Sequence, residues 1–459
     1  MFKKIRKLLG CSLLAAALTV GSAVGVSAAV DVSATTGTYP VESDSWANWP
    51  QSPSMLAVTA CLMDADTGAI LYARGMDVPR FPASITKVMT ALVVMEHADL
   101  NAQVAFTETG LADAYGGSSN INPTLGEVFT VDQMLQMLLV KSANDVATQL
   151  AEAVGGSVEN FAAMMNQKAA ELGCTNTHFA NASGLENDDH YVSAHDMALI
   201  MKAAISHDRL REIMNVQSIQ VPETNASGAR YYDTHLQMLV PGNEYYYEGA
   251  LGGKTGYTPV SGSTLVMYAT RENRTLIGVV MGSQSAQLDT NGCCIDMADL
   301  FDYGFYSFSY QDMTGGYPYL WGGTALLPNG MDPAGVNVLT EETPEGVLYS
   351  YQYNGQNLGN GLMAKDTYDA MQAALQSAAE TEMAAQEGTE DAVTSSSADA
   401  PEERTGNSGK SGRTVVMTIA IAVLTVSILG CIVLIILTSE GHQKKLHSQR
   451  RNRKNKKDR

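Results

Sequence analysis

Short apolar runs mark strands near both ends of a patterned stretch, residues 54–310. Two hairpins are predicted, with turns at residues 64–68 and 271–274, because each turn is polar and lies between two apolar runs. One more strand precedes the second hairpin. Five strands are therefore expected, over residues 56–63, 69–73, 252–257, 263–270 and 275–282.

Helical spacing of apolar residues dominates between those strands. Pro82 opens one predicted helix, a capping box at residues 130–133 opens another, and residues 144–172 and 193–207 are predicted to be helical. Strands at both ends with helices between them predict an α+β fold. We expect a five-stranded antiparallel sheet flanked by helices, together with a helical lobe.

The patterned stretch, residues 54–310, is followed by a different composition. Residues 311–375 carry short apolar and aromatic runs among Gly and Tyr, which predict a small β-rich appendage ending in a helix near residues 367–379. Residues 30–53 are rich in Ser, Thr and Pro and are expected to form a linker. Residues 376–412 are acidic and poor in large apolar side chains, so we expect a flexible stalk.

Both ends of the chain carry targeting signals. Residues 1–29 place basic residues before an apolar stretch that ends in small residues, as in a secretory signal peptide, with an uncleaved anchor as the alternative. Residues 413–438 predict a transmembrane helix. The basic cytoplasmic tail, 439–459, follows, and residues 441–459 hold nine Lys or Arg against one Asp. We expect a single-pass protein of the cell membrane, with its body extracellular or periplasmic.

Charge and cysteine content exclude several classes of function. The net charge is −19 for 459 residues and −31 for residues 30–440, so no nucleic-acid partner is expected. Cysteines within that body are Cys61, Cys174, Cys293 and Cys294, and their pairing stays open. The sequence has no H-E-x-x-H and no Cys/His cluster, so we expect neither a metal nor another cofactor.

A nucleophile and a candidate base stand three residues apart at the start of the helix after Pro82. Ser84 and Lys87 share one helix face at this spacing. A serine hydroxyl needs an adjacent base in order to attack, and a lysine amine becomes a base only when burial or a neighbouring cation lowers its pKa. Because the S-x-x-K pattern is common, it needs support from the rest of the chain.

Two further triplets give this support. Ser142-Ala143-Asn144 begins 58 residues after Ser84, and Lys254-Thr255-Gly256 begins 112 residues after Ser142. In this order the three motifs resemble those of the penicillin-recognising serine enzymes. Longer segments, within about residues 54–308, are similar to the D-alanyl-D-alanine carboxypeptidases, the low-molecular-mass penicillin-binding proteins: Asp66–Gly68, Phe81–Thr90, Ser142–Asp145, His178–Leu185 and Lys254–Thr258.

This resemblance implies a serine DD-peptidase whose catalytic residues are Ser84, Lys87 and Ser142. Ser84 would attack the bond between the last two D-alanines of a peptidoglycan stem peptide, with Lys87 as general base and Ser142 as the proton relay, held by Lys87 and Lys254. The backbone N–H groups of Ser84 and Tyr257 would form the oxyanion hole, and β-lactams would be inhibitors. The implied substrate-binding residues are Asn144, Lys254, Thr255, Gly256, Tyr257 and Thr258.

One departure from the family pattern leaves alternatives open. Similar enzymes carry an Arg beyond the last hairpin strand to bind the terminal carboxylate, whereas residues 282–289 contain no cation. Endopeptidase action or weak turnover would fit this difference. A β-lactamase is an alternative that the missing E-x-x-L-N motif opposes. A catalytically weak scaffold that binds cell-wall peptides is another, which the intact motifs oppose. Asn181 and Asp196 are predicted to tie loops.

Overall fold

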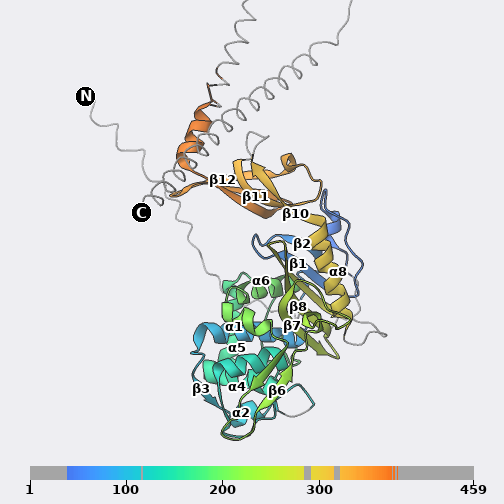
Figure 1. Cartoon of the computed structure of the whole chain (residues 1–459), viewed down its shortest axis with the longest axis vertical. Coiled ribbons are helices and arrows are strands. Elements are labelled where there is room, and N and C mark those ends of the chain that lie inside the picture. The colour runs from blue at the N-terminus through green and yellow to red at the C-terminus, as the bar shows by residue number, and fades with distance from the viewer. Residues whose placement is uncertain are drawn as a thin grey trace, which may run out of the picture.

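The structure is a computed structural model that describes residues 39–114, 117–283, 291–314, 321–374, 376–377 and 380. A helical lobe, a central sheet and a second sheet follow one another along its longest axis (Figure 1). The predicted signal peptide, 1–29, and the predicted membrane helix, 413–438, lie outside the described residues. Within the described ranges, no helix has the length and apolarity needed to cross a bilayer.

The central sheet is antiparallel, with the strand order β2-β1-β9-β8-β7. Thr59 of β1 lies opposite Met281 of β9, so the sheet joins segments from the two ends of the patterned region. The predicted five-stranded antiparallel sheet is thereby confirmed. Its strands are β1 (Thr59–Asp64), β2 (Ile70–Arg74), β7 (Ala250–Thr258), β8 (Gly262–Arg271) and β9 (Arg274–Ser283).

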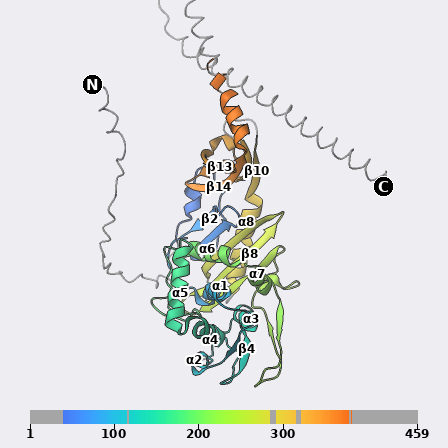
Figure 2. The ribbon, with the colours of Figure 1, turned by 90° about the vertical axis from the view of Figure 1, so that its left-hand side faces the viewer.

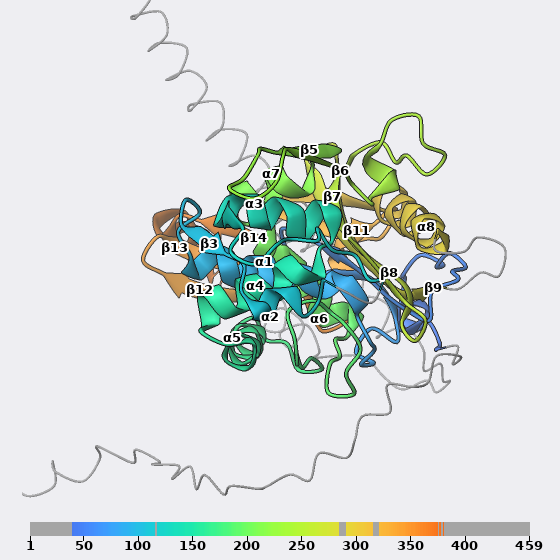
Figure 3. The same ribbon diagram turned by 90° about the horizontal axis from the view of Figure 1, so that it is seen from below.

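Helices cover both faces of this sheet, α8 on one side and α6 on the other, with α1 packed against α6 (Figure 3). Successive side chains of β1 alternate between the two cores. Ala60 and Leu62 belong to the core under α8, whereas Cys61 and Met63 belong to the core of the helical lobe. The helices are α1 (Lys87–His97), α6 (Ala194–Ala204) and α8 (Gly292–Ser307).

The helical lobe differs from the sequence prediction at two places. The predicted helix 144–172 is two helices, because Gly156 takes a φ of +76° and Ser157 caps the second one. The capping box at Thr130 is present, but the helix that it opens passes into a π-helical turn after six residues. The elements of this lobe are η2 (Ala83–Thr86), β3 (Gln103–Ala105), α2 (Glu108–Leu111), β4 (Val128–Thr130), α3 (Val131–Gln136), η3 (Met137–Lys141), α4 (Asn144–Gly155), α5 (Val158–Glu171), α7 (Asp208–Met214), β5 (Ser218–Val221), β6 (Arg230–Asp233) and η4 (Gln237–Leu239).

The appendage is a second five-stranded antiparallel sheet, ordered β10-β11-β14-β13-β12, at the end remote from α2 and α4 (Figure 2). Hydrogen bonds fasten it to the central sheet, among them those of Gln356 and Tyr310. The Gln356 side chain bonds both backbone groups of Ile70, and the Tyr310 hydroxyl donates to Asp64 at 3.0 Å. A helix over residues 365–374 follows. The elements are β10 (Phe308–Thr314), β11 (Trp321–Pro328), η5 (Pro333–Gly335), β12 (Asn337–Thr343), β13 (Gly346–Tyr353) and β14 (Gln356–Met363).

Residues 41–49, part of the predicted linker, pack along the outer edge of β2. Their 3-10 turn is η1 (Glu42–Ser45). The Trp49 indole N–H donates to Leu71 O at 2.7 Å, and the Trp49 ring stacks on Tyr353 of the appendage. Aromatic residues in this segment give it apolar surface to bury, which explains why it packs against the folded body. We refer to residues 41–50 as the strap.

Candidate active site

Ser84 and Lys87 meet where the 3-10 turn η2 passes into α1. Lys87 Nζ lies 2.9 Å from Ser84 Oγ, 2.7 Å from Asn144 Oδ1 and 2.6 Å from Ser183 O. Lys87 is fully buried, whereas Ser84 is partly exposed. The two residues singled out by the S-x-x-K spacing are therefore brought together, with the hydroxyl open to solvent and the amine enclosed.

The hydrogen-bond partners of Lys87 Nζ determine where its lone pair points. Asn144 Oδ1 and Ser183 O are carbonyl oxygens, which only accept hydrogen bonds. A neutral amine has two hydrogens and one lone pair, so the two carbonyls take both hydrogens. The lone pair of neutral Lys87 is then left facing Ser84 Oγ, the third neighbour. This is the arrangement of a general base next to its nucleophile.

The electrostatic surroundings favour the neutral form. Burial lowers the pKa of Lys87 well below its usual value, and the nearby Lys254 ammonium lowers that pKa further, while Asp113 and Asp145 oppose the shift. Burial also lowers the pKa of Lys254, to about 7. Near neutral pH, Lys87 and Lys254 are therefore less protonated than a lysine in water, whose pKa is about 10.4.

Backbone packing fixes the position of Ser84. Ala83 takes a left-handed φ of +51°, which is strained for a residue with a Cβ. Thr264 of β8 donates its hydroxyl to Pro82 O at 2.8 Å, and Gly256 of β7 packs so closely that a Cβ there would lie 2.8 Å from Ser84 N. The sheet therefore holds the nucleophile through the residues just before it.

The second motif lies at the junction of η3 and α4. Ser142 takes a left-handed φ of +64°, which turns the chain so that Asn144 starts α4 beside Lys87. Ser119 O accepts from Asn144 N at 2.8 Å. Within the described ranges, Ser142 Oγ makes no hydrogen bond to Lys87 or Lys254, so the predicted holding of this hydroxyl by both lysines is absent here. With its left-handed backbone, Ser142 does not place its hydroxyl in hydrogen-bonding geometry with the amine of Lys87 or of Lys254.

Strand β7 supplies the third motif from the edge of the sheet. Lys254 is buried, and its ammonium donates to Thr255 O at 2.8 Å. Tyr257 is 54% exposed, whereas Gly256 is buried against Ser84. The Thr258 hydroxyl bonds Ser261 Oγ at 3.0 Å and so ties the turn that follows β7, a contact that differs from its predicted use as a substrate ligand.

Sequence reasoning missed the group that completes the Lys87 site, the backbone carbonyl of Ser183. Its loop is held by Asn181, whose Oδ1 accepts from Ser183 N and Gly184 N, and by Thr90, whose hydroxyl donates to Ala182 O at 2.7 Å. The resemblance over His178–Leu185 marked the loop without assigning it a role. A carbonyl is present in every residue, so residue type carries no signal for it. The predicted tying role of Asn181 agrees with these bonds.

The end of β9, where the family pattern has an Arg, holds a guanidinium from another segment. Residues 284–290 lie outside the described ranges, but Gly282 and Ser283 are described. A Cβ at Gly282 would lie 3.0 Å from Arg80 Nη2, and Arg80 is buried. This arginine precedes Ser84 by four residues, a placement that sequence order did not indicate.

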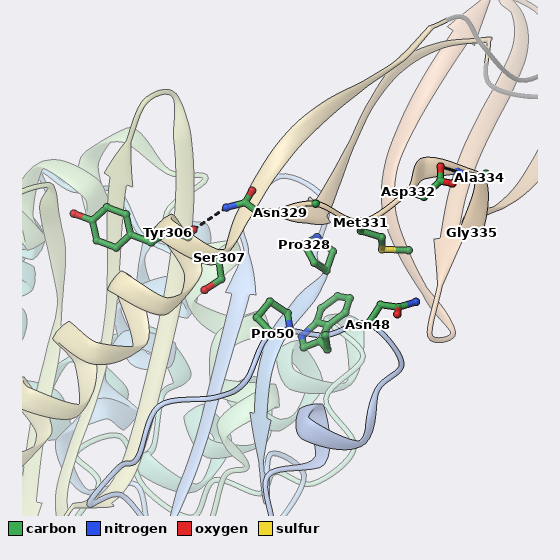
Figure 4. A pocket seen from close by; sticks show the side chains of 12 residues that line it. Asn48, Pro50, Tyr306, Ser307, Pro328, Asn329, Met331, Asp332, Ala334 and Gly335 are labelled. Carbon is green, nitrogen blue, oxygen red and sulfur yellow. Dashed lines mark hydrogen bonds between the residues drawn. The ribbon is translucent and has the colours of Figure 1, made fainter.

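A separate hollow of about 800 Å³ lies where the appendage meets the central sheet (Figure 4). Its walls come from the strap, the end of α8 and the link after β11, and include Pro50, Ser307, Pro328 and Met331. None of the three motifs contributes to it, and its lining, which includes the hydroxyls of Tyr306 and Ser307, contains no Lys or His. The nucleophile and lysine base that the motifs predict are found together at Ser84, away from this hollow.

Comparisons with known proteins agree with this geometry. The family model for D-alanyl-D-alanine carboxypeptidase matches residues 47–285. D-alanyl-D-alanine carboxypeptidase DacB2 of Mycobacterium tuberculosis is 34% identical over 265 residues, which are 56% of this chain and 84% of DacB2. DacF of Bacillus subtilis is 33% identical over 232 residues, which are 50% of this chain and 58% of DacF, so the match spans little more than half of that relative.

Solved structures give the same result for the fold. A D-alanyl-D-alanine carboxypeptidase from Mycobacterium tuberculosis superimposes with a TM-score of 0.52 at 33% identity, covering 57% of this chain and 95% of that one. The Streptomyces K15 DD-transpeptidase gives a TM-score of 0.52 at 28% identity, covering 56% and 100%. Motif order, site geometry and these matches lead to one conclusion: the chain belongs to the D-alanyl-D-alanine carboxypeptidase family of serine peptidases.

Proposed function

We propose that this protein is a membrane-tethered serine DD-peptidase that removes the terminal D-Ala from peptidoglycan stem peptides, and that penicillins inhibit it by acylating Ser84. The observation that carries the proposal is the placement of Lys87 Nζ, 2.9 Å from Ser84 Oγ with two carbonyl oxygens on its other sides. A base held in this way is the requirement for an activated serine nucleophile. The family supplies the substrate class.

Acylation begins when Ser84 Oγ attacks the carbonyl carbon between the two terminal D-alanines and its proton passes to Lys87 Nζ. The backbone N–H groups of Ser84 and Tyr257 stabilise the oxyanion. The C–N bond then breaks, the departing amine takes a proton by way of Ser142, and the peptide remains as an ester on Ser84. Water hydrolyses the ester and restores the hydroxyl. A β-lactam follows the same first step and forms a longer-lived ester.

Three groups with free hydrogen-bonding capacity suit the binding of the substrate. Asn144 Nδ2 and the Thr255 hydroxyl make no hydrogen bond within the described part of the chain, and Thr255 is partly exposed. Lys254 donates to one carbonyl, so two of its ammonium hydrogens remain for a carboxylate. We assign the acyl-side backbone to Asn144 and the terminal carboxylate to Lys254 and Thr255.

The preference for a terminal D-Ala over an internal bond rests on the carboxylate site. The Lys254 ammonium is a point charge with a pKa of about 7. It attracts a carboxylate less strongly than a guanidinium that binds both carboxylate oxygens. We therefore propose carboxypeptidase activity as the main reaction. Because Arg80 at the end of β9 is buried, we expect a lower discrimination against internal D-Ala bonds than an exposed arginine within residues 282–289 would give.

We further propose that the protein is exported and anchored by residues 413–438, with the tail 439–459 in the cytoplasm. The support is the sequence pattern at both ends of the chain. Cell fractionation, with protease digestion of intact spheroplasts that carry a C-terminal epitope, tests this arrangement. The epitope should stay with the membrane and be protected, and a soluble or digested epitope would refute it.

The activity is tested on the detergent-purified full chain with a fluorescent penicillin and with a model peptide ending in D-Ala-D-Ala. Wild type should form a covalent label and release D-Ala, and Ser84→Ala should do neither. Ser307→Ala is a matched control because Ser307 lines the separate hollow. Equal labelling of wild type and Ser84→Ala would refute the mechanism, as would release of D-Ala by Ser84→Ala.

A further inference from the structure

The loop that carries the Ser183 carbonyl is fastened to the catalytic helix by a buried histidine. The loop closes on itself through His178 and Tyr191, whose backbone groups exchange two hydrogen bonds of 2.8 and 2.9 Å. His190 is 1% exposed and points back across the loop. Its two ring nitrogens contact different parts of the site, and these contacts determine which nitrogen carries the proton.

The neighbours of His190 select one tautomer. Nδ1 lies 3.1 Å from Ala180 N and 3.4 Å from Asn181 N, and both are backbone donors. Nδ1 must therefore be the unprotonated, accepting nitrogen. The ring proton then lies on Nε2, which donates to Thr86 Oγ1 at 2.9 Å. A second ring proton would face two N–H groups, and burial, His178 and Lys87 together lower the pKa of His190 to about 3.

Both ends of this contact lead to the nucleophile–base pair. Thr86 stands between Ser84 and Lys87 in η2. From Ala180 and Asn181 the loop runs through Asn181 Oδ1 to Ser183, whose carbonyl accepts from Lys87 Nζ at 2.6 Å. His190 thus closes a ring of contacts that begins at the backbone of the catalytic turn and ends at the catalytic amine.

The same loop is also packed closely against the catalytic turn, which leaves little room for this ring of contacts to shift. A Cβ at Gly184 would collide with Ala83 O and lie 2.8 Å from Thr86 Oγ1. The loop and the catalytic turn are therefore in direct backbone contact on one side and joined by the His190–Thr86 bond on the other. Release of that bond frees the loop to move the Ser183 carbonyl away from Lys87.

We propose that His190, through its Nε2–H bond to Thr86, is a positioning residue that holds the Ser183 carbonyl against Lys87 and so keeps the Lys87 lone pair on Ser84. This inference rests on the proposed function, because it concerns the base of the acylation step. When the loop loosens, water reaches the amine and offsets the burial that keeps it neutral. The acylation rate then falls, and the pH at which Lys87 loses its proton rises.

The test compares full-length wild type with His190→Asn, Thr86→Val, the double variant and Thr86→Ser. Asn keeps an acceptor for the Ala180 N–H, but it is shorter than His and has no donor at the Nε2 position that contacts Thr86. Val removes the Thr86 hydroxyl at nearly constant volume. The rate of Ser84 labelling by a fluorescent penicillin is measured from pH 5 to 10. His195→Asn is the matched control, because His195 lies on the same stretch and bonds Asp77 at the surface.

Each single variant should move the acid limb of the rate profile up by about one pH unit, with a loss of about tenfold in rate below that limb. The double variant should lose no more than either single one, and Thr86→Ser should keep the wild-type profile. A lower melting temperature with an unchanged profile would overturn the proposal and make His190 a structural residue. If His190→Asn fails to fold, Thr86→Val decides the question by itself. Absence of label on wild type would instead refute the proposed function.

Discussion

Substitution of Gly256 by alanine tests the role of β7 in acylation. The added Cβ would lie 2.5 Å from Thr264 Oγ1, 2.8 Å from Ser84 N and 3.1 Å from Ala83 Cβ. Thr264 can rotate at the cost of its bond to Pro82 O, which is worth about 1 kcal/mol. Ser84 N is backbone and cannot rotate away, so β7 must shift by a few tenths of an ångström.

That shift widens the gap between the Tyr257 and Ser84 N–H groups that the mechanism uses for the oxyanion. Loss of one such donor costs about 10²–10³ in rate, or about 2.7–4 kcal/mol. Crowding alone lowers stability by about 1–3 kcal/mol. We therefore expect the acylation rate of Gly256→Ala with a fluorescent penicillin to fall at least about a hundredfold, while urea unfolding shows a moderate loss.

Gly252→Ala is the matched control on the same strand. Its Cβ would meet Met214 Cβ at 2.8 Å and Tyr268 Cε1 at 2.9 Å, which is comparable crowding without contact to Ser84. Its stability should fall by a similar amount and its acylation rate should stay near wild type. Equal acylation rates in the two variants would refute the argument that Gly256 sets the distance between β7 and the nucleophile.

Three further predictions follow from buried polar groups. Lys254→Met should raise the free energy of unfolding by about 1–4 kcal/mol at pH 6 and abolish acylation, because the wild-type ammonium is buried with one hydrogen bond. Since burial lowers the pKa of Lys254 to about 7, wild type gains stability as the pH rises from 7 toward 10.5. Urea unfolding at pH 9.5 should therefore show a smaller difference in stability between the variant and wild type. Glu127→Gln should cost about 3 kcal/mol, because it breaks a buried pair with Arg230 at 2.7 Å. Burial raises the pKa of Glu127, but its bonds to Arg230 outweigh burial and leave that pKa below its usual value. The stability that the Glu127–Arg230 pair gives wild type should therefore be lost as the pH falls below 4.5. An acid unfolding midpoint that is the same in Glu127→Gln and wild type would contradict this prediction. Tyr310→Phe should cost about 1–3 kcal/mol by leaving the buried Asp64 carboxylate with fewer donors, and labelling of Ser84 should not change.

The catalytic pair and the two hairpins were accessible from sequence because each depends on short-range geometry. Ser84 and Lys87 meet through a fixed spacing at a helix start, and the two hairpins follow from polar turns between apolar runs. The order of elements, with strands at both ends and helices between them, predicted one sheet that joins the two ends of the region, and the order of the motifs indicated the family. The roles given to the site residues remain predictions for the experiments above.

What sequence reasoning missed depends on long-range packing. The Ser183 carbonyl and the His190–Thr86 bond come from a loop about 100 residues after Lys87, and backbone acceptors leave no mark in residue type. The left-handed turn at Ser142 was equally invisible, because a serine there is unusual for its φ of +64°. The break at Gly156 was signalled by the Gly-Gly pair, but the apolar period on both sides suggested one continuous helix.

The strand order of the central sheet has a consequence for how the chain folds. β1 pairs with β9, so Thr59 must find Met281 across more than 200 residues of intervening chain. The helices between Lys87 and Met214 pack on one another, α4 on α5 and α1 on α6, and can collapse early, whereas the sheet closes only after β9 has joined β1. Until then the β1–β2 hairpin has one face and one edge without partners, which is the state most exposed to aggregation. We therefore expect closure of β1 onto β9 to be the slow step of folding, and a growing chain to reach this step only after Ser283, the last residue of β9, has been synthesised.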